Sequence, residues 1–437
     1  MNEKDNQLDT DNSVSKIRKK KGEDEGRTKF MKKILVTLIA GLTAVTTIMG
    51  GSSIQAAVSF KDVPSNHWAK TSIDSAVSKG YFKGYSNGTF KPSASVTRSE
   101  FASLLARVSK ADPNVDISNV FNDLSNHWSK KEVDRAVSLG FINPADYPNG
   151  FKPNTPITRE EMAKWISSGL AAADTDFKKA LEDTKTTLVP VKESFSPGIS
   201  EAKAPYISVV IGTGVMTGYP DNSFGVTQTT TRAEASVILL RIANMEGKKA
   251  SSFSDLNEIR AVGTTKSNLS QVTPFSTAND KTYAVISGKT KTLSNGAGKV
   301  SLHRTIYINT TNWTNKKSVY APFFVSEENK DFYKENTNVI PVFHEITVYP
   351  KAKNFSSDHI RTGLNTALSG QRIAPSSLPE KYGYLTLPVY NTEQFFAKYS
   401  ASNGVKLWIK ENKNVDREGL IGMYYMDDGS ALSLYNK

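Results

Sequence analysis

Three segments of the chain place a capping box directly before apolar residues at helical spacing. The boxes are Thr97–Glu100, Thr158–Glu161 and Thr231–Glu234, each with the pattern Thr-Arg-x-Glu. In such a box the Thr hydroxyl accepts from the third helical N–H, and the Glu carboxylate accepts from the N-cap N–H. We therefore predict that a helix begins at each box, with an Arg in its first position. The apolar stripes that follow are Phe101, Leu104, Leu105 and Val108; Met162, Trp165 and Ile166; and Ala235, Ile238, Leu239 and Ile242.

Each box closes a longer unit that occurs three times. Arg98 and Arg232 lie 134 residues apart, and the same offset relates Ile73 to Ile207 and other apolar and Gly positions. The first two copies align at an offset of 60 in their first half and of 61 in their second. Each unit is typical of a helix, a loop and a second helix. Because one such unit cannot bury its apolar face alone, we expect three copies around one helical core.

The pattern changes in the last third of the chain. From about residue 282, short segments rich in β-branched and aromatic residues are separated by Gly, Asn and Pro, which indicates a β-rich or α+β domain. Helices are expected only near Asp358–Leu368 and Thr392–Ser400. The expected strands are Thr282–Ile286, Thr305–Ile308, Val319–Val325, Val339–Val348, Tyr384–Tyr390, Lys406–Ile409 and Gly422–Tyr425.

The start of the chain has the pattern of a secretory signal peptide. Lys32 and Lys33 precede an apolar run, and small residues up to Ala56 offer a cleavage site. An uncleaved membrane anchor is the alternative; the Gly and Thr within the run disfavour it. Residues 1–30 are polar and charged, so we interpret Met31 as the true start, with a long cytoplasmic extension as the alternative.

These patterns divide the chain into seven parts. The insertion is polar and is expected to form a short solvated helix and a loop, and the linker is rich in Ser, Thr and Asn. The parts are residues 1–56, an extension with the signal peptide; 58–110, 117–170 and 201–256, the three repeats; 171–200, the insertion; 257–281, the linker; and 282–437, the C-terminal domain.

Composition narrows the chemistry. The chain has 437 residues, a net charge of +12 and no cysteine, which excludes disulfides, Cys-ligated zinc and thiol catalysis. The positive charge favours an anionic partner, but it is spread evenly after residue 33, which disfavours nucleic acid. An Arg beside the free N–H groups of a helix N-terminus suits an anion. The alternative for each Arg is an exposed residue without a role.

The repeat motifs resemble those of the S-layer homology domain. The first copy has Phe60–Val63, His67-Trp68, Gly84-Tyr85, Asn87–Pro92 and Thr97–Glu100 in the order of that family. The resemblance implies a mainly helical, pseudo-threefold spindle with three prongs and grooves between them. It also implies non-covalent attachment to the secondary cell wall polymer of Gram-positive bacteria, often at a pyruvylated sugar.

The resemblance also implies which residues bind the polymer. The central Arg of the family corresponds to Arg98, Arg159 and Arg232, whose planar guanidinium suits a ketal-pyruvate carboxylate. Copy one matches throughout, and copy two lacks the Gly-Tyr step. Copy three lacks the head, the segment that carries Asp62 and Trp68 in copy one, and has Ala202 at the Trp68 position. It also has Gly225-Val226 in place of Lys-Pro. For the two tryptophans a core position is favoured and a sugar platform is the alternative, and His67 and His127 are expected to help cap or pack the first helix. The other expected polymer contacts are Asp62, Trp68, Gly84, Tyr85, Lys91, Asp123, Trp128, Lys152, Gly218 and Tyr219.

The C-terminal domain has no strong catalytic signature. His344-Glu345 lacks a second His at zincin spacing, and nothing supplies a nucleophile beside Asp358-His359. We therefore expect a secreted, monomeric cell wall protein without cofactor, metal or a lasting membrane anchor, displaying an adhesin-like or S-layer-associated binding domain. The alternative is a surface hydrolase tethered by the repeats. A lattice-forming subunit is disfavoured because the C-terminal part is small.

Overall fold

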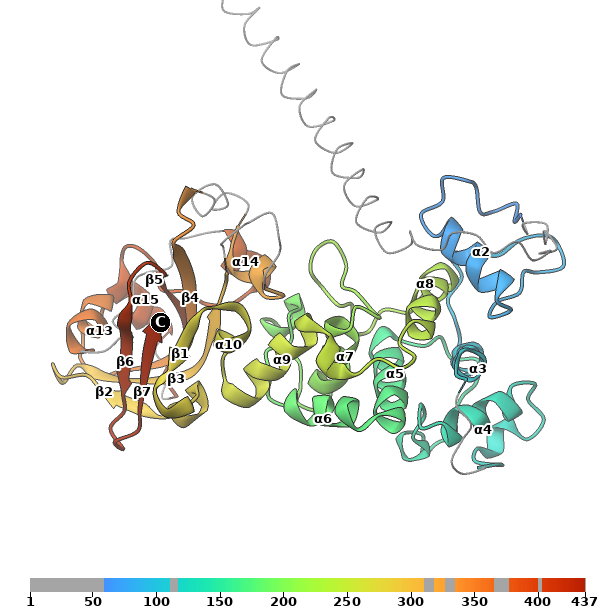
Figure 1. Cartoon of the computed structure of the whole chain (residues 1–437), viewed down its shortest axis with the longest axis horizontal. Helices are drawn as coiled ribbons and strands as arrows, with labels where there is room; N and C mark the ends of the chain where they lie inside the picture. The colour runs from blue at the N-terminus through green and yellow to red at the C-terminus, as the bar shows by residue number, and fades with distance from the viewer. Residues whose placement is uncertain are drawn as a thin grey trace, which may run out of the picture. The chain divides into compact units, whose positions relative to one another are not determined.

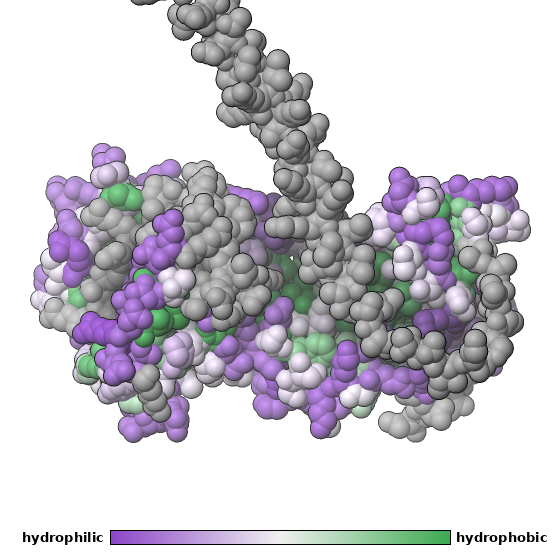
Figure 2. All heavy atoms as spheres, turned by 45° about the horizontal axis from the view of Figure 1, so that its top comes forward, coloured by the Kyte–Doolittle hydropathy of each residue, from purple (hydrophilic) through white to green (hydrophobic). Residues whose placement is uncertain are grey.

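A computed structural model describes residues 59–110, 117–309, 318–326, 335–364, 377–399 and 403–436 (Figure 1). The predicted signal peptide lies outside these residues. Within them, every helix is too short or too polar to span a bilayer. Hydrophilic residues cover most of the described surface on the face shown in Figure 2.

Each repeat is a pair of helices, as predicted. The second helix of each pair begins directly after the Thr of its box, and that Thr accepts a hydrogen bond from the box Glu N–H. Phe101, Trp165 and Leu239, one from each second helix, are buried in one shared core. The pairs are α2 (Lys70–Ser78) and α3 (Arg98–Val108), α4 (Lys130–Ser138) and α5 (Arg159–Ala173), and α7 (Ala204–Gly212) and α8 (Arg232–Ala243).

The three repeats close into a ring through their helix N-termini. The N–H of Arg98 donates to Thr155 O at 2.9 Å, linking copy one to copy two. The equivalent bonds run from Arg159 N to Gln228 O at 2.8 Å and from Arg232 N to Ala94 O at 2.9 Å. Each repeat thus donates to the next and the third donates to the first, which gives the pseudo-threefold arrangement expected from the sequence.

The insertion is packed rather than solvated. Its helix α6 (Thr175–Asp183) buries Phe177 and Ala180, because its apolar residues lie on one face. The bond between Ser196 and Pro197 in the following segment is cis.

Residues 257–281 are helical and sheet-forming where we expected a linker. Helix α9 (Ser254–Thr265) continues the repeats and fully buries Leu256, Ile259 and Val262, whose spacing of three marks a helix face. Helix α10 (Leu269–Val272) and strand β1 (Phe275–Thr277) follow. The Ser and Thr content concealed this pattern.

The C-terminal domain contains two antiparallel sheets. One has the order β2-β3-β4-β5 and the other β1-β7-β6. Strand β4 (Val339–Pro350) is the long central strand, paired with β3 (Gly298–Tyr307) and β5 (Val405–Asn414). The remaining strands are β2 (Thr290–Thr292), β6 (Gly419–Tyr425) and β7 (Ala431–Asn436).

Several short elements differ from the predicted strands. Residues 282–286 form the 3-10 turn η6 (Tyr283–Val285), Val319–Val325 contains the helix α11 (Ala321–Phe324), and Tyr384–Tyr390 makes only an isolated bridge from Thr386 to Trp408. The helices α13 (Ser357–Gly363) and α15 (Thr392–Tyr399) lie where helices were expected. The remaining elements are α14 (Ser377–Tyr382), η1 (Asn122–Leu124), η2 (Pro144–Asp146), η3 (Lys192–Ser194), η4 (Ala250–Ser252) and η5 (Ala278–Asp280).

Candidate functional site

The three box arginines lie between repeats. The Arg98 guanidinium donates to Phe151 O at 3.0 Å, in the loop of copy two. Arg159 donates from Nε to Phe224 O at 2.6 Å in copy three, and Arg232 donates from Nε to Phe90 O at 2.9 Å in copy one. Each guanidinium therefore caps the loop of the next repeat.

This arrangement pairs each loop with the arginine of another repeat. The loop of copy one, with Gly84, Tyr85 and Lys91, contacts Arg232 of copy three. Arg98 contacts the loop of copy two. The N–H groups of the first helical residues are also not free for an anion, because they donate to carbonyls of the neighbouring repeat. Sequence reasoning missed this pairing because it depends on contacts between copies.

The arginines differ in exposure. Arg159 and Arg232 are 4% and 6% exposed, and each lies over aromatic rings of the loop it caps. The Arg98 side chain is 18% exposed and donates from Nε to Glu161 Oε1 at 2.8 Å. Its second terminal nitrogen has no partner among the described residues. Arg98 is thus the most exposed of the three guanidinium groups.

The head acids shape the loops. Asp62 accepts from the N–H groups of Phe90 at 2.8 Å and Lys91 at 2.7 Å, and Asp123 accepts in the same way in copy two. Partial desolvation raises the pKa of Asp62, but these backbone bonds outweigh it and hold the pKa below its ordinary value. Both carboxylates therefore hold the backbone of the loop in their own repeat.

Copy three has such an acid after all, at Glu193. Its carboxylate accepts from Phe224 N at 2.9 Å and Gly225 N at 2.7 Å. The N–H of Lys192 donates to Asn222 O, as that of Lys61 donates to Gly88 O in copy one. The expectation that copy three has lost its head is wrong. The head acid Glu193 lies inside the insertion, so the offset of 134 residues that aligns the rest of copy three with copy one does not align it with Asp62. The pair Lys192-Glu193, equivalent to Lys61-Asp62, was the available signal.

Two loop lysines adopt an unusual backbone conformation. Lys91 and Lys152 have φ values of 56° and 54°, in the left-handed region, whereas copy three has Gly225 with φ 73° there. Lys91 Nζ lies 4.2 Å from the centre of the Tyr85 ring. Copies one and two thus keep a cation at a position where Gly is the relaxed residue.

The loop glycines and Tyr219 have packing roles. A Cβ on Gly84 would lie 2.1 Å from the Phe60 ring, and one on Gly218 would lie 2.9 Å from Ser223 O. The Tyr219 ring lies 4.6 Å from the Arg159 guanidinium. These residues let the loop approach its head and its arginine closely.

Trp68 and Trp128 are exposed, which corrects the expectation of core packing. They are 66% and 60% exposed, and each lies beside the ring of the preceding His. The Nδ1 atoms of His67 and His127 accept from the N–H of Ala69 and Ser129, the residue directly before each first helix, and neither helix has a side-chain cap bond. The two indoles are available for a partner.

A groove of about 420 Å³ lies at Arg98. It is lined by the loop of copy two and the box of α5, and carries both signs of charge. The Tyr147 hydroxyl donates to Glu161 at 2.5 Å, and burial together with that carboxylate raises the pKa of Tyr147 far above its usual value. Lys152 on the rim is exposed and makes no ion pair with a described residue. The charged lining residues are Arg98, Lys152, Lys164, Asp146, Glu160 and Glu161.

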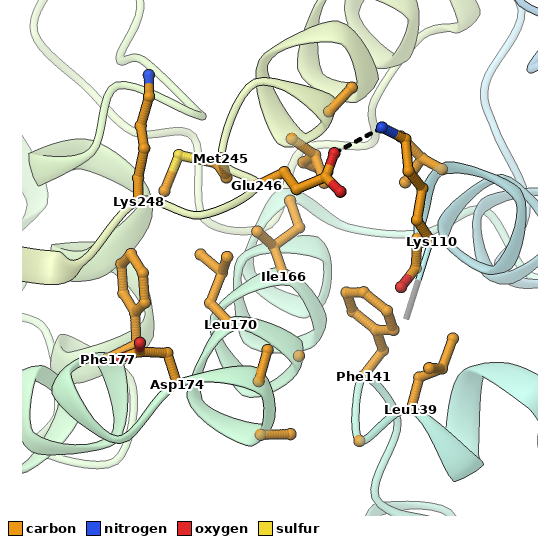
Figure 3. A pocket seen from close by; sticks show the side chains of 18 of the residues that line it. Lys110, Leu139, Phe141, Ile166, Leu170, Asp174, Phe177, Met245, Glu246 and Lys248 are labelled. Atoms are coloured by element: carbon orange, nitrogen blue, oxygen red, sulfur yellow. Dashed lines mark hydrogen bonds and ion pairs between the residues drawn. The ribbon is translucent and has the colours of Figure 1, made fainter. Parts of the chain in front are cut away.

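A larger hollow of about 520 Å³ lies at the other end of the same helices (Figure 3). Phe141, Ile166 and Leu170 form its apolar wall, and Lys110 pairs with Glu246 at its rim. None of the predicted polymer contacts lines this hollow, so it is separate from the arginine sites.

His344 and His359 of the C-terminal domain both make hydrogen bonds within the protein. His344 is fully buried, and its two ring nitrogens contact Thr305 Oγ1 and Glu411 Oε1 at 2.9 Å. His359 contacts the Ser356 N–H and hydroxyl at the start of α13. The described residues include no cluster of His, Asp and Glu suited to a metal.

Comparison with known proteins identifies the repeats. The profile of the S-layer homology domain matches residues 59–102, 120–163 and 197–236. "Cell surface glycoprotein 1" of Acetivibrio thermocellus is 39% identical over 127 residues, 26% of this chain and 5% of that protein. The "Cellulosome-anchoring protein" of the same organism is 33% identical over 118 residues, 26% of each chain. "S-layer protein sap" of Bacillus anthracis is 30% identical over 215 residues, 49% of this chain and 25% of its own.

These relatives share only part of their length with this chain, which spans between 5% and 26% of each. The matched segments cover the first helix of each pair, the loop that an arginine caps and the start of the second helix. The chain therefore carries three S-layer homology domains, and it is a secreted protein of the cell wall surface.

Proposed function

We propose that the three domains hold the chain to an anionic, pyruvylated secondary cell wall polymer. The observation that carries this proposal is the cyclic placement of one guanidinium against the aromatic loop of each repeat. A guanidinium in a partly desolvated groove pairs strongly with a carboxylate. A ketal-pyruvate group supplies such a carboxylate on a sugar.

The loop lysines support the same ligand chemistry. A non-Gly residue in the left-handed region costs about 1 kcal/mol or more, so its presence is a reason to consider function. Both lysines accept this conformation; Lys91 and Arg232 lie over the same Tyr85 ring, and Lys152 lines the groove at Arg98. The loop of copy one with Arg232 and the loop of copy two with Arg98, called grooves one and two, are therefore the main sites in our proposal.

The exposed tryptophans suit neighbouring sugars. An indole that remains mostly in solvent offers an apolar face to a pyranose ring. Trp68 and Trp128 occur at the same position in the two repeats whose loops carry a lysine, whereas copy three has Ala202. We assign them to contacts along the polymer chain outside the grooves.

The test is binding of the full chain to isolated wall polymer, before and after chemical removal of the ketal pyruvate. We expect binding to fall strongly after removal. Arg98→Ala should weaken binding by at least about 1.5 kcal/mol, the loss of one charge-assisted bond. Arg107→Ala, at the other end of α3, is the matched control. Equal binding by the two variants would contradict the proposal.

The C-terminal domain is assigned a binding rather than a catalytic role. His344 is fully buried, so a substrate does not reach it in this structure. The domain's described surface instead exposes aromatic residues, including Tyr390, Tyr425 and Tyr435. Hydrolysis of peptidoglycan or protein by the full chain, abolished by His359→Ala, would favour the tethered hydrolase.

A further inference from the structure

The third groove, which is the loop of copy three together with Arg159, has a head segment that contacts two hydrophobic cores. Glu193 holds the loop amides of Phe224 and Gly225, and this loop in turn lies against Arg159. In copies one and two the residue two positions before the head acid, Phe60 or Phe121, is buried in the shared core of the repeats, and Val191 has this place before Glu193. Glu193 is in addition followed by Phe195, which packs against a second core.

That second core belongs mainly to the C-terminal domain. The Phe195 ring lies 4.9 Å from the Tyr384 ring and 5.4 Å from the Phe323 ring. Leu188, at the start of the same segment, is buried among these residues, and its carbonyl accepts from the Tyr320 hydroxyl at 2.7 Å. The C-terminal domain thus contacts the segment on both sides of Glu193.

A third contact reaches the groove loop itself. Asn222 Nδ2 donates to the Tyr382 hydroxyl at 2.5 Å, and that hydroxyl donates to Pro322 O. Asn222 lies two residues before Phe224, whose carbonyl accepts from Arg159. The loop is therefore held from one side by Glu193 and from the other by the C-terminal domain.

We propose that the C-terminal domain positions the third groove, so that this groove takes its binding conformation only when the domain is docked. The proposal rests on the proposed function for its ligand. It extends that function, because binding at one of the three sites then depends on docking of the C-terminal domain. Tyr320, Tyr382 and Phe195 are positioning residues in this scheme, because they act through Glu193 and the loop. Grooves one and two have no such contact with the C-terminal domain among the described residues.

The first test is amide hydrogen exchange of the full chain carrying Tyr320→Phe and Tyr382→Phe together. These changes keep both rings and remove only the hydroxyls that reach the third repeat. We expect exchange at Phe224 and Gly225 to be about five-fold faster for each lost bond. The equivalent amides in the loops of copies one and two should be unchanged and serve as internal references.

Tyr384→Phe is the matched control. It removes a buried hydroxyl from the same aromatic cluster, but that hydroxyl donates to Phe323 O within the C-terminal domain. This variant should leave exchange in the third loop at its parent rate. Equal exchange at Phe224 and Gly225 in the double variant and in Tyr384→Phe would overturn the proposal.

The second test is calorimetric titration with a methyl glycoside that carries a 4,6-pyruvate ketal. In the parent chain Arg159→Ala should remove part of the binding, whereas in the double variant it should remove nothing further. A double variant that keeps the Arg159-dependent binding would overturn the proposal. Failure of the parent to bind this probe would refute the proposed function instead, and the exchange comparison would still decide the present proposal.

Discussion

Replacing Arg232 with alanine tests the claim that the box arginines join neighbouring repeats. The Arg232 guanidinium donates to Phe90 O at 2.9 Å and to Lys83 O at 3.0 Å. It is 6% exposed and lies within about 5 Å of the Phe82, Tyr85 and Phe90 ring centres. Its removal leaves two carbonyls without these partners and opens the contact between copies three and one.

The expected loss follows from these contacts. Two charge-assisted hydrogen bonds contribute about 1.5 kcal/mol or more each, and the cation–π contacts add about 1 kcal/mol. We therefore expect Arg232→Ala to lower the free energy of unfolding by about 4 kcal/mol. Arg241→Ala is the control on the same helix. Its guanidinium makes one long bond to Val215 O at 3.4 Å, so its loss should be about 1 kcal/mol.

Urea unfolding followed by circular dichroism measures both variants against the parent chain. A midpoint that falls much further for Arg232→Ala than for Arg241→Ala would support the joining role. Arg232→Met separates volume from hydrogen bonding, because it fills most of the space without donating. If Arg232→Ala unfolds at the parent midpoint, the guanidinium is not a structural contact, and the cyclic scheme is wrong.

Three further predictions concern single side chains. Glu193→Ala should speed amide exchange in the third loop at least about five-fold, whereas Glu201→Ala at an exposed position should not; equal rates would show that Glu193 does not hold the loop. Burial raises the pKa of Glu258 to about 7 despite hydrogen bonds that oppose the shift. Its folded pKa exceeds the unfolded one, so its stabilising contribution is present below about pH 4.5 and is lost as pH rises through 7, by up to about 3 kcal/mol. Unfolding midpoints at pH 5 and pH 8 should therefore differ less in Glu258→Gln than in the parent. Trp68→Ala should change stability by less than about 0.5 kcal/mol because the indole is exposed, and it should weaken polymer binding; a large fall in the melting temperature would restore the core interpretation.

The sequence alone determined the repeated helix pairs. Capping and apolar spacing are local properties, so Thr97, Thr158 and Thr231 could be identified as N-caps without a partner structure. The same local reasoning placed β4, because its long β-branched run is buried on both faces. It failed at α9, where polar residues outnumber a short apolar stripe.

Only the tertiary structure decided which residues share a groove. The partner of each arginine lies in another repeat. Arg232 contacts the loop that carries Lys91, 141 residues earlier in the sequence, and Arg98 contacts the loop of copy two. The role of Glu193 was hidden for the same reason, because an insertion changed its distance from the loop it holds. Helix ends are fixed by neighbours in the chain, but grooves are fixed by packing between distant segments, and spacing along one copy does not encode that packing.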